Sequence, residues 1–142
     1  MKASKEIGVG LIGFGTVGAG VVEALAKNCG LLERRTGLKL ELKKIADIDL
    51  ERDRGVKVER SLLTSDAMSL IDDKAVDIVV ELIGGTTISK DFILHALAKK
   101  KPVVTANKAL LAEHGAEIFA AAEENNTDTF FEASVGGGIP IV

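Results

Sequence analysis

The chain has 142 residues and a formal net charge of −3, with 46% hydrophobic and 27% charged residues. This composition is typical of a globular domain with its own core, and the lack of a long basic run argues against nucleic-acid binding. The apolar stretch near the start is too short for a signal peptide or a membrane span, and Cys29 is the single cysteine, so we expect a cytoplasmic protein with no membrane partner and no internal disulfide.

The N-terminal stretch predicts a strand, a glycine turn and a helix in succession. An apolar strand over about 7–12 leads into Gly13, Gly15 and Gly18, which have G-x-G-x-x-G spacing. In this context Gly13 permits a tight turn, Gly15 lets a pyrophosphate approach the backbone, and Gly18 lets the helix pack closely on the strand. The free N–H groups at the helix start would face the phosphates. The stretch therefore predicts dinucleotide binding.

The next elements follow from glycine positions and hydrophobic periodicity. The first helix is expected over about 16–28, with Gly30 as its stop and a loop over 31–37. Residues 38–46 begin with leucines alternating with charged residues, and this period of two predicts a strand. Residues 47–63 are polar and are expected to be irregular.

The rest of the chain alternates between helices and strands. We expect a short helix capped by Ser65 and ending near Ile71, a strand over 77–83, a helix from Thr87 or Ser89 to about Lys101, a strand over 102–105, a helix over 108–125 and a strand over 129–132. Strict alternation implies parallel strands joined by right-handed crossovers. The prediction is therefore one dinucleotide-binding domain over 1–142, with an α/β fold of the Rossmann type: a doubly wound, mainly parallel sheet with helices on both faces.

The expected ligand site lies beyond the carboxyl ends of the strands, where such sheets bind their ligands. Four segments meet there, and each is short and polar or contains glycine: Gly13 to Gly18, Asp47, the run Gly84, Gly85, Thr86 and Thr87, and the run Thr105, Ala106, Asn107 and Lys108. Among these, Thr105 and Asn107 offer neutral hydrogen-bonding groups. We expect all four segments to contribute to cofactor binding.

Asp47 is the candidate ligand of the adenosine ribose. A carboxylate at this place accepts hydrogen bonds from the 2′-OH and repels a 2′-phosphate. Asp47 lies 29 positions after Gly18, where about 20 is usual, and the loop over 31–37 would account for the excess. Because Arg52 or Arg54 could still accept a phosphate, NAD is favoured over NADP without excluding it.

Lys108 is the candidate catalytic residue. It opens a helix, where a cation is unfavourable for the helix dipole, and such a local conflict suggests a functional reason. Beside a nicotinamide it could orient substrate or assist proton transfer; the alternative is an ordinary surface lysine. His95 and His114 are interpreted as helix surface residues, and the sequence has no His and Cys cluster of metal-ligand spacing.

Four motifs in the chain closely resemble the homoserine dehydrogenase family. They are Gly10 to Gly18 (GLIGFGTVG), Val80 to Thr86 (VELIGGT), Val104 to Leu111 (VTANKALL) and Phe131 to Ile141 (FEASVGGGIPI). The resemblance covers the whole chain and implies an oxidoreductase that interconverts aspartate semialdehyde and homoserine with NAD or NADP, on the route to threonine, methionine and isoleucine.

The resemblance also implies roles for individual residues. Phe14, Thr16 and Val17 would line the cofactor phosphates, Thr86 would lie near the nicotinamide, and Lys108 would be the active-site lysine. A monovalent cation, usually sodium, would be bound by the set Glu132, Val135, Gly137 and Ile139.

Two departures from the family pattern matter. Many members have Val-Arg-Asp where this chain has Asp47, Ile48 and Asp49, which weakens the case for NADP. The family's substrate domain, with a second catalytic lysine, follows the point where this chain stops, so we expect this chain to bind cofactor without turning over substrate. A full-length protein would be a homodimer or homotetramer acting on a small molecule. The alternatives are another semialdehyde or amino-acid dehydrogenase, or a non-enzymatic NAD(H) sensor.

Overall fold

A computed structural model describes residues 5–136, which form one six-stranded parallel sheet in the order β3-β2-β1-β4-β5-β6. This order confirms the predicted Rossmann-type fold. The strands are β1 (Lys5–Ile12), β2 (Leu38–Ala46), β3 (Leu63–Thr64), β4 (Ile78–Glu81), β5 (Val103–Thr105) and β6 (Thr129–Phe130). The helices are α1 (Thr16–Thr36), α2 (Ala67–Asp72), α3 (Ile88–Ala98) and α4 (Lys108–Glu124), with short 3-10 turns η1 (Arg60–Leu62) and η2 (Glu132–Ser134).

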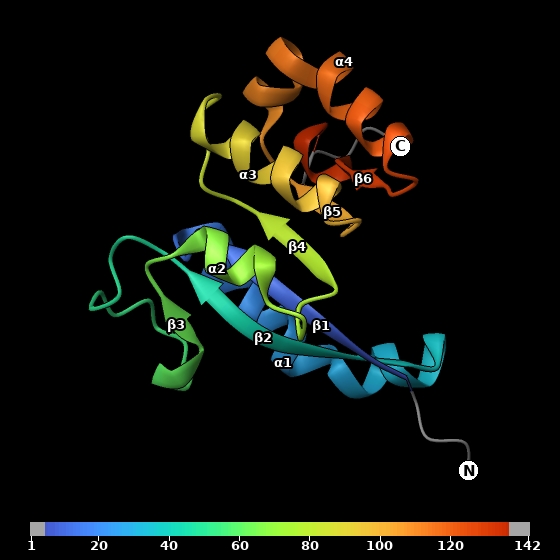
Figure 1. Cartoon of the computed structure of the whole chain (residues 1–142). Helices are drawn as coiled ribbons and strands as arrows, with labels where there is room; N and C mark the ends of the chain where they lie inside the picture. Colours follow the sequence, from blue (N-terminus) through green and yellow to red (C-terminus); the bar gives the residue numbers. More distant parts are fainter. Residues whose placement is uncertain (1–4, 137–142) are drawn as a thin grey trace.

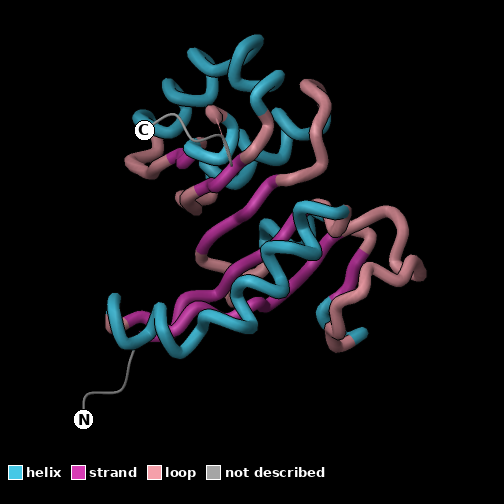
Figure 2. The backbone as a smooth tube through the Cα atoms, turned by 180° about the vertical axis from the view of Figure 1, so that it is seen from behind, coloured by secondary structure: helices cyan, strands magenta, loops and turns pink. Residues whose placement is uncertain are grey.

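Helices cover both faces of the sheet, as predicted. Figure 1 shows α2 in front of β1 and β2, and the reverse view in Figure 2 brings α1 to the front. The core of one face joins α2, α3 and α4 to Ile12, Val79 and Val103, while the core of the other joins α1 to Leu11 and Ile45. No helix in residues 5–136 is both long and apolar enough to cross a membrane.

The predicted end of the first helix is wrong. Helix α1 passes through Gly30 and continues to Thr36, so residues 31–36 are helical rather than a loop. Gly37 ends the helix with a φ of 73°, and its N–H donates to the carbonyl of Glu33. An interior glycine costs a helix only about 1 kcal/mol, and the packing of α1 along β2 outweighs that cost. The long spacing between Gly18 and Asp47 therefore comes from a longer helix.

Three smaller predictions also need correction. Asp66 rather than Ser65 caps α2, because its carboxylate accepts the N–H of Ser69 at 2.9 Å. Helix α3 ends at Ala98, so residues 99–101 follow its last turn, and Lys100 has a φ of 59°. The segment 47–63, expected to be irregular, includes η1 and ends on the first residue of β3, which pairs with the end of β2. The strand predicted over 38–46 is confirmed to the residue.

Candidate functional site

The glycine turn between β1 and α1 has the geometry that its spacing predicts. Gly13 has a φ of 99°, in the region that favours glycine, and its N–H donates to the carbonyl of Ala46 at 2.8 Å. A Cβ on Gly18 would lie 2.1 Å from the Gly13 carbonyl oxygen, so only glycine allows this approach of helix and turn. A Cβ on Gly15 would meet nothing within 4 Å. The space above Gly15 is therefore open to a ligand.

The start of α1 is suited to an anion. Gly15 occupies the N-cap position, no side chain caps the helix, and its first turn contains no acidic residue. Thr16 and Val17 are exposed. Backbone N–H groups at an uncapped helix start bind phosphate or carboxylate groups readily.

A cavity of about 540 Å³ lies beside this turn, at the carboxyl ends of β1, β2 and β4. It sits where the strand order reverses between β1 and β4, the place at which doubly wound sheets bind nucleotides. Its walls include Gly13, Gly15, Asp47, Ile48, Ser65, Leu82 and Ile83. Most of the lining is apolar, as expected of a pocket for a flat aromatic base.

Asp47 lies at the end of β2 and fastens the glycine turn. Its Oδ2 accepts the N–H of Phe14 at 2.6 Å, and its Oδ1 accepts the N–H of Asp49 at 2.9 Å. Arg54 pairs with Asp47 at 3.3 Å and lies over the Phe14 ring, 5.0 Å from the centroid. An ionised carboxylate has about four lone-pair sites, so Asp47 retains capacity for a ribose hydroxyl.

Arg52 and Arg54, the two arginines that could accept a 2′-phosphate, differ in their exposure. Arg54 is largely buried by its contacts with Phe14 and Asp47, and it also donates to the Phe14 carbonyl. Arg52 is exposed. Both line a hollow of about 390 Å³ together with Gly15 and Thr16 at the start of α1. Ile48, the uncharged residue that follows Asp47, is 97% exposed.

A second cavity, of about 370 Å³, lies on the other side of the glycine turn. It is lined by Val17, by residues 82–85 after β4 and by residues 106–109 after β5. Gly84 and Gly85 both have positive φ values, 75° and 76°. Lys108 lines the cavity, is exposed, and is the first residue of α4. The half-buried Thr86 continues the turn toward α3.

Thr105 and Asn107 reach the predicted edge of the sheet, but their side chains are buried and bonded within the protein. The Thr105 hydroxyl donates to Glu81 at 2.7 Å. Asn107 caps α4 by accepting the N–H of Leu110 at 3.1 Å, and it donates to the carbonyl of Gly85 at 2.7 Å. Glu81 is not among the predicted site residues, although a carboxylate inside the apolar run 77–83 is a visible signal.

The predicted sodium set is only partly within the described residues. Glu132 and Val135 are exposed; Glu132 is the first residue of η2 and Val135 follows its end, where the Val135 N–H donates to the Glu132 carbonyl at 3.2 Å. Gly137 and Ile139 lie outside residues 5–136, so the set stays a prediction. Within that range, no group of three or more His, Cys, Asp or Glu residues could hold a metal ion.

Comparison with known proteins gives one consistent result. The family model described as homoserine dehydrogenase, NAD binding domain, matches residues 13–132. The homoserine dehydrogenase of Bacillus subtilis is 46% identical over 138 residues, which cover 97% of this chain and 32% of that protein. That of Corynebacterium glutamicum is 48% identical over 137 residues, covering 96% and 30%.

A solved structure agrees with these relatives. The crystal structure of a homoserine dehydrogenase from Thiobacillus denitrificans superposes with a TM-score of 0.88 at 43% identity, over 96% of this chain and 32% of that one. The chain thus spans about a third of the length of the relatives it matches.

Proposed function

Since this chain belongs to the homoserine dehydrogenase family, as its NAD-binding domain, we propose that it binds NAD(H) for the interconversion of L-aspartate 4-semialdehyde and L-homoserine. The observation that carries the proposal is the open glycine turn between two cavities. Gly15 leaves free space above an uncapped helix start, and both cavities share Leu82 and Ile83. A dinucleotide can therefore reach from one cavity to the other across the turn.

Each part of the site suits one part of the cofactor. The apolar cavity beside Asp47 would take the adenosine, with the carboxylate accepting a ribose hydroxyl. The first turn of α1, with Phe14, Thr16 and Val17 around Gly15, would hold the pyrophosphate. The second cavity, between Gly85 and Lys108, would take the nicotinamide.

Lys108 would act on the reacting carbonyl. A nicotinamide, when bound, would supply the hydride that reduces the substrate carbonyl, and negative charge would then develop on the carbonyl oxygen. The Lys108 ammonium, held at the start of α4 by the Asn107 cap, would stabilise that charge and supply the proton. Its exposed position beside the second cavity leaves it free for this role.

The binding step is tested on the chain itself. Calorimetric titration with NADH should show one saturable site, and the absence of binding would overturn the proposal. The catalytic step requires a full-length protein containing this domain. There, Lys108→Ala should lower kcat by roughly two to three orders of magnitude, as for other electrostatic donors.

The matched control for that variant is Lys27→Ala, since Lys27 is an exposed lysine on α1 that pairs only with Glu23 among the described ion pairs. It should leave kcat unchanged. A Lys108→Ala enzyme as active as the Lys27→Ala enzyme would return Lys108 to an ordinary surface lysine.

A further inference from the structure

The buried polar side chains of residues 5–136 belong to one hydrogen-bonded network. They are Glu81, Ser89, Thr105, Asn107 and Ser134. The network lies beneath the second cavity, where the segments after β4 and β5 meet the starts of α3 and α4. Buried polar groups are costly unless they are hydrogen-bonded, so a cluster of five in one place calls for a specific reason.

Glu81 is the centre of this network. It is the last residue of β4 and is completely buried. Its Oε1 accepts the N–H groups of Ile83 at 2.9 Å and Gly84 at 3.4 Å, and its Oε2 accepts the Thr105 hydroxyl at 2.7 Å. The carboxylate therefore ties the turn after β4 directly to the end of β5.

The remaining contacts extend this tie to the first turn of α4. The Thr105 hydroxyl oxygen accepts the N–H of Asn107 at 3.0 Å. The Asn107 amide donates to the Gly85 carbonyl at 2.7 Å, and Ser89 donates to the same carbonyl at 2.6 Å. Ser134 donates to the Thr105 carbonyl at 2.9 Å. One set of hydrogen bonds thus connects the two walls of the second cavity, formed by residues 82–85 and 106–109.

The described hydrogen bonds of Glu81 are all accepted by its two carboxyl oxygens. Every described partner donates to it, and the single hydrogen of the Thr105 hydroxyl is used on Oε2 while its oxygen accepts from Asn107. None of the described ion pairs includes Glu81. A buried, unpaired carboxylate is a poor way to gain stability, since a well-packed apolar side chain would serve better.

We propose that Glu81 is a positioning residue for the nicotinamide half of the site. Its carboxylate fixes the conformation of the Gly84–Gly85 turn and, through Thr105 and Asn107, the place of Lys108. Two successive glycines with positive φ have little conformational preference of their own, so the turn depends on the bonds from Glu81. This inference rests on the proposed NAD(H) binding.

The test compares two ligands on wild type and Glu81→Gln. The glutamine can still accept from Ile83 with its oxygen, but its amide group then faces the Thr105 hydroxyl, which loses its acceptor. NADH should bind about tenfold more weakly, a difference typical of one lost buried hydrogen bond to a charged group. ADP, which lacks the nicotinamide and its ribose, should keep its Kd within about twofold.

A matched control is Asp77→Asn. Asp77 precedes β4, and its carboxylate accepts the N–H of Gly8 at 2.7 Å, toward the opposite edge of the sheet. Both NADH and ADP should bind this variant as they bind wild type. Equal loss of NADH and ADP binding in Glu81→Gln would instead indicate general disruption of the domain and would overturn the inference.

A second pair of variants covers the case in which Glu81→Gln does not fold. Thr105→Ser keeps the hydroxyl between Glu81 and Asn107, and Thr105→Val removes it. The serine variant should bind NADH about fivefold more tightly than the valine variant, and equal affinities would contradict the inference. A wild-type chain that binds no NADH at all would defeat the proposed function itself, which separates the two failures.

Discussion

At the scale of single residues, we expect the charge of Asp47 to determine the choice between the two nicotinamide cofactors. Its carboxylate borders the first cavity, and the exposed Ile48 beside it offers no positive charge. We expect NADH to bind at least about tenfold more tightly than NADPH, because a 2′-phosphate would approach this carboxylate. Calorimetric titration of both cofactors measures the preference.

The Asp47→Asn variant isolates the charge. Its side-chain oxygen can still accept the N–H of Phe14, so the glycine turn should persist. The difference in affinity between NADH and NADPH should become smaller. Asp49→Asn serves as the control, because Asp49 is exposed and lines neither of the two main cavities. Tighter binding of NADPH by wild type would show that an arginine of the 52–54 loop dominates instead.

A substitution at Gly15 should abolish cofactor binding and leave folding unchanged. Its φ of −75° is open to any residue, and a Cβ would meet no atom within 4 Å. Gly15→Val should therefore keep a native circular dichroism spectrum and a near-native melting temperature, yet lose NADH binding, because the branched side chain occupies the pyrophosphate space. Native affinity in this variant would place the phosphates elsewhere.

At the scale of elements, the contact between α1 and the glycine turn is the tightest constraint on this helix. A Cβ on Gly18 would lie 2.1 Å from a backbone carbonyl, whereas one on Gly20 would meet nothing within 4 Å. Gly18→Ala should lower the free energy of unfolding by about 1–3 kcal/mol. Gly20→Ala, two residues further along the same helix, should raise the free energy of unfolding by about 0.5–1 kcal/mol.

Urea denaturation of the two alanine variants gives these free energies directly. The opposite signs of the two changes in the free energy of unfolding matter more than their magnitudes, since both substitutions add the same methyl group to the same helix. Equal effects at the two positions would mean that α1 shifts away from the turn without cost, and the close packing of helix and turn would then be unimportant.

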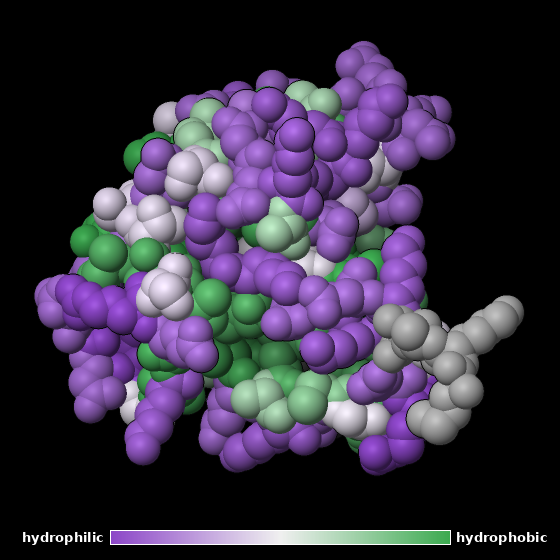
Figure 3. All heavy atoms as spheres, turned by 60° about the horizontal axis from the view of Figure 1, so that its bottom comes forward, coloured by the Kyte–Doolittle hydropathy of each residue, from purple (hydrophilic) through white to green (hydrophobic). Residues whose placement is uncertain are grey.

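At the scale of the whole molecule, the two faces of the sheet are covered unequally. Helices α2, α3 and α4 pack on one face, while α1 is the helix packed on the other. Phe130, which pairs with Val104 in the register of β5 and β6, remains 45% exposed. Hydrophobic atoms are also visible among the hydrophilic ones on the face shown in Figure 3.

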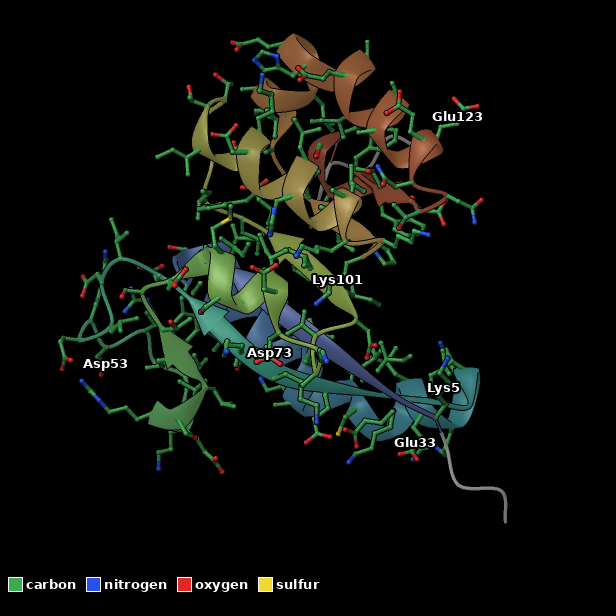
Figure 4. The ribbon with its side chains drawn as sticks, viewed as in Figure 1. Lys5, Glu33, Asp53, Asp73, Lys101 and Glu123 are labelled. Atoms are coloured by element: carbon green, nitrogen blue, oxygen red, sulfur yellow. The ribbon has the colours of Figure 1, made fainter. Side chains whose placement is uncertain are left out.

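Acid should destabilise the molecule through Asp73, which joins separate parts of the fold (Figure 4). Its carboxylate pairs with Lys44 of β2 at 2.8 Å, and its carbonyl accepts from Lys101 at 2.6 Å. The hydrogen bond from Lys44, and to a smaller extent that from the N–H of Ala75, holds the pKa of Asp73 below its ordinary 3.8. The stabilisation is therefore present above that value and is lost as the pH falls through the lower pKa of the folded state.

Thermal melts between pH 7 and pH 3 test whether the stabilisation from Asp73 is lost as the pH falls. The melting temperature of wild type should fall below about pH 4. Asp73→Asn should melt lower than wild type at pH 7 and show a smaller further decrease in acid. A wild-type melting temperature that stays constant to pH 3 would contradict the assignment.

Local signals in the sequence were sufficient for the class of fold. The alternation over 38–46 and the three glycines from Gly13 to Gly18 each act within a few residues of themselves, because strand pleating and turn geometry are local properties. The order of the elements along the chain then determined the parallel strands, and the proposed site at their carboxyl edge follows from that topology.

Only the tertiary structure decided where α1 ends and what the buried side chains do. Gly30 looked like a stop because its local cost is real, but packing against β2, which no local pattern reports, carried the helix to Gly37. Glu81 and Thr105 are 24 positions apart and meet because β4 and β5 are neighbours in the sheet. Hydrogen bonds between adjacent strands depend on register, and register exists only once the chain has folded.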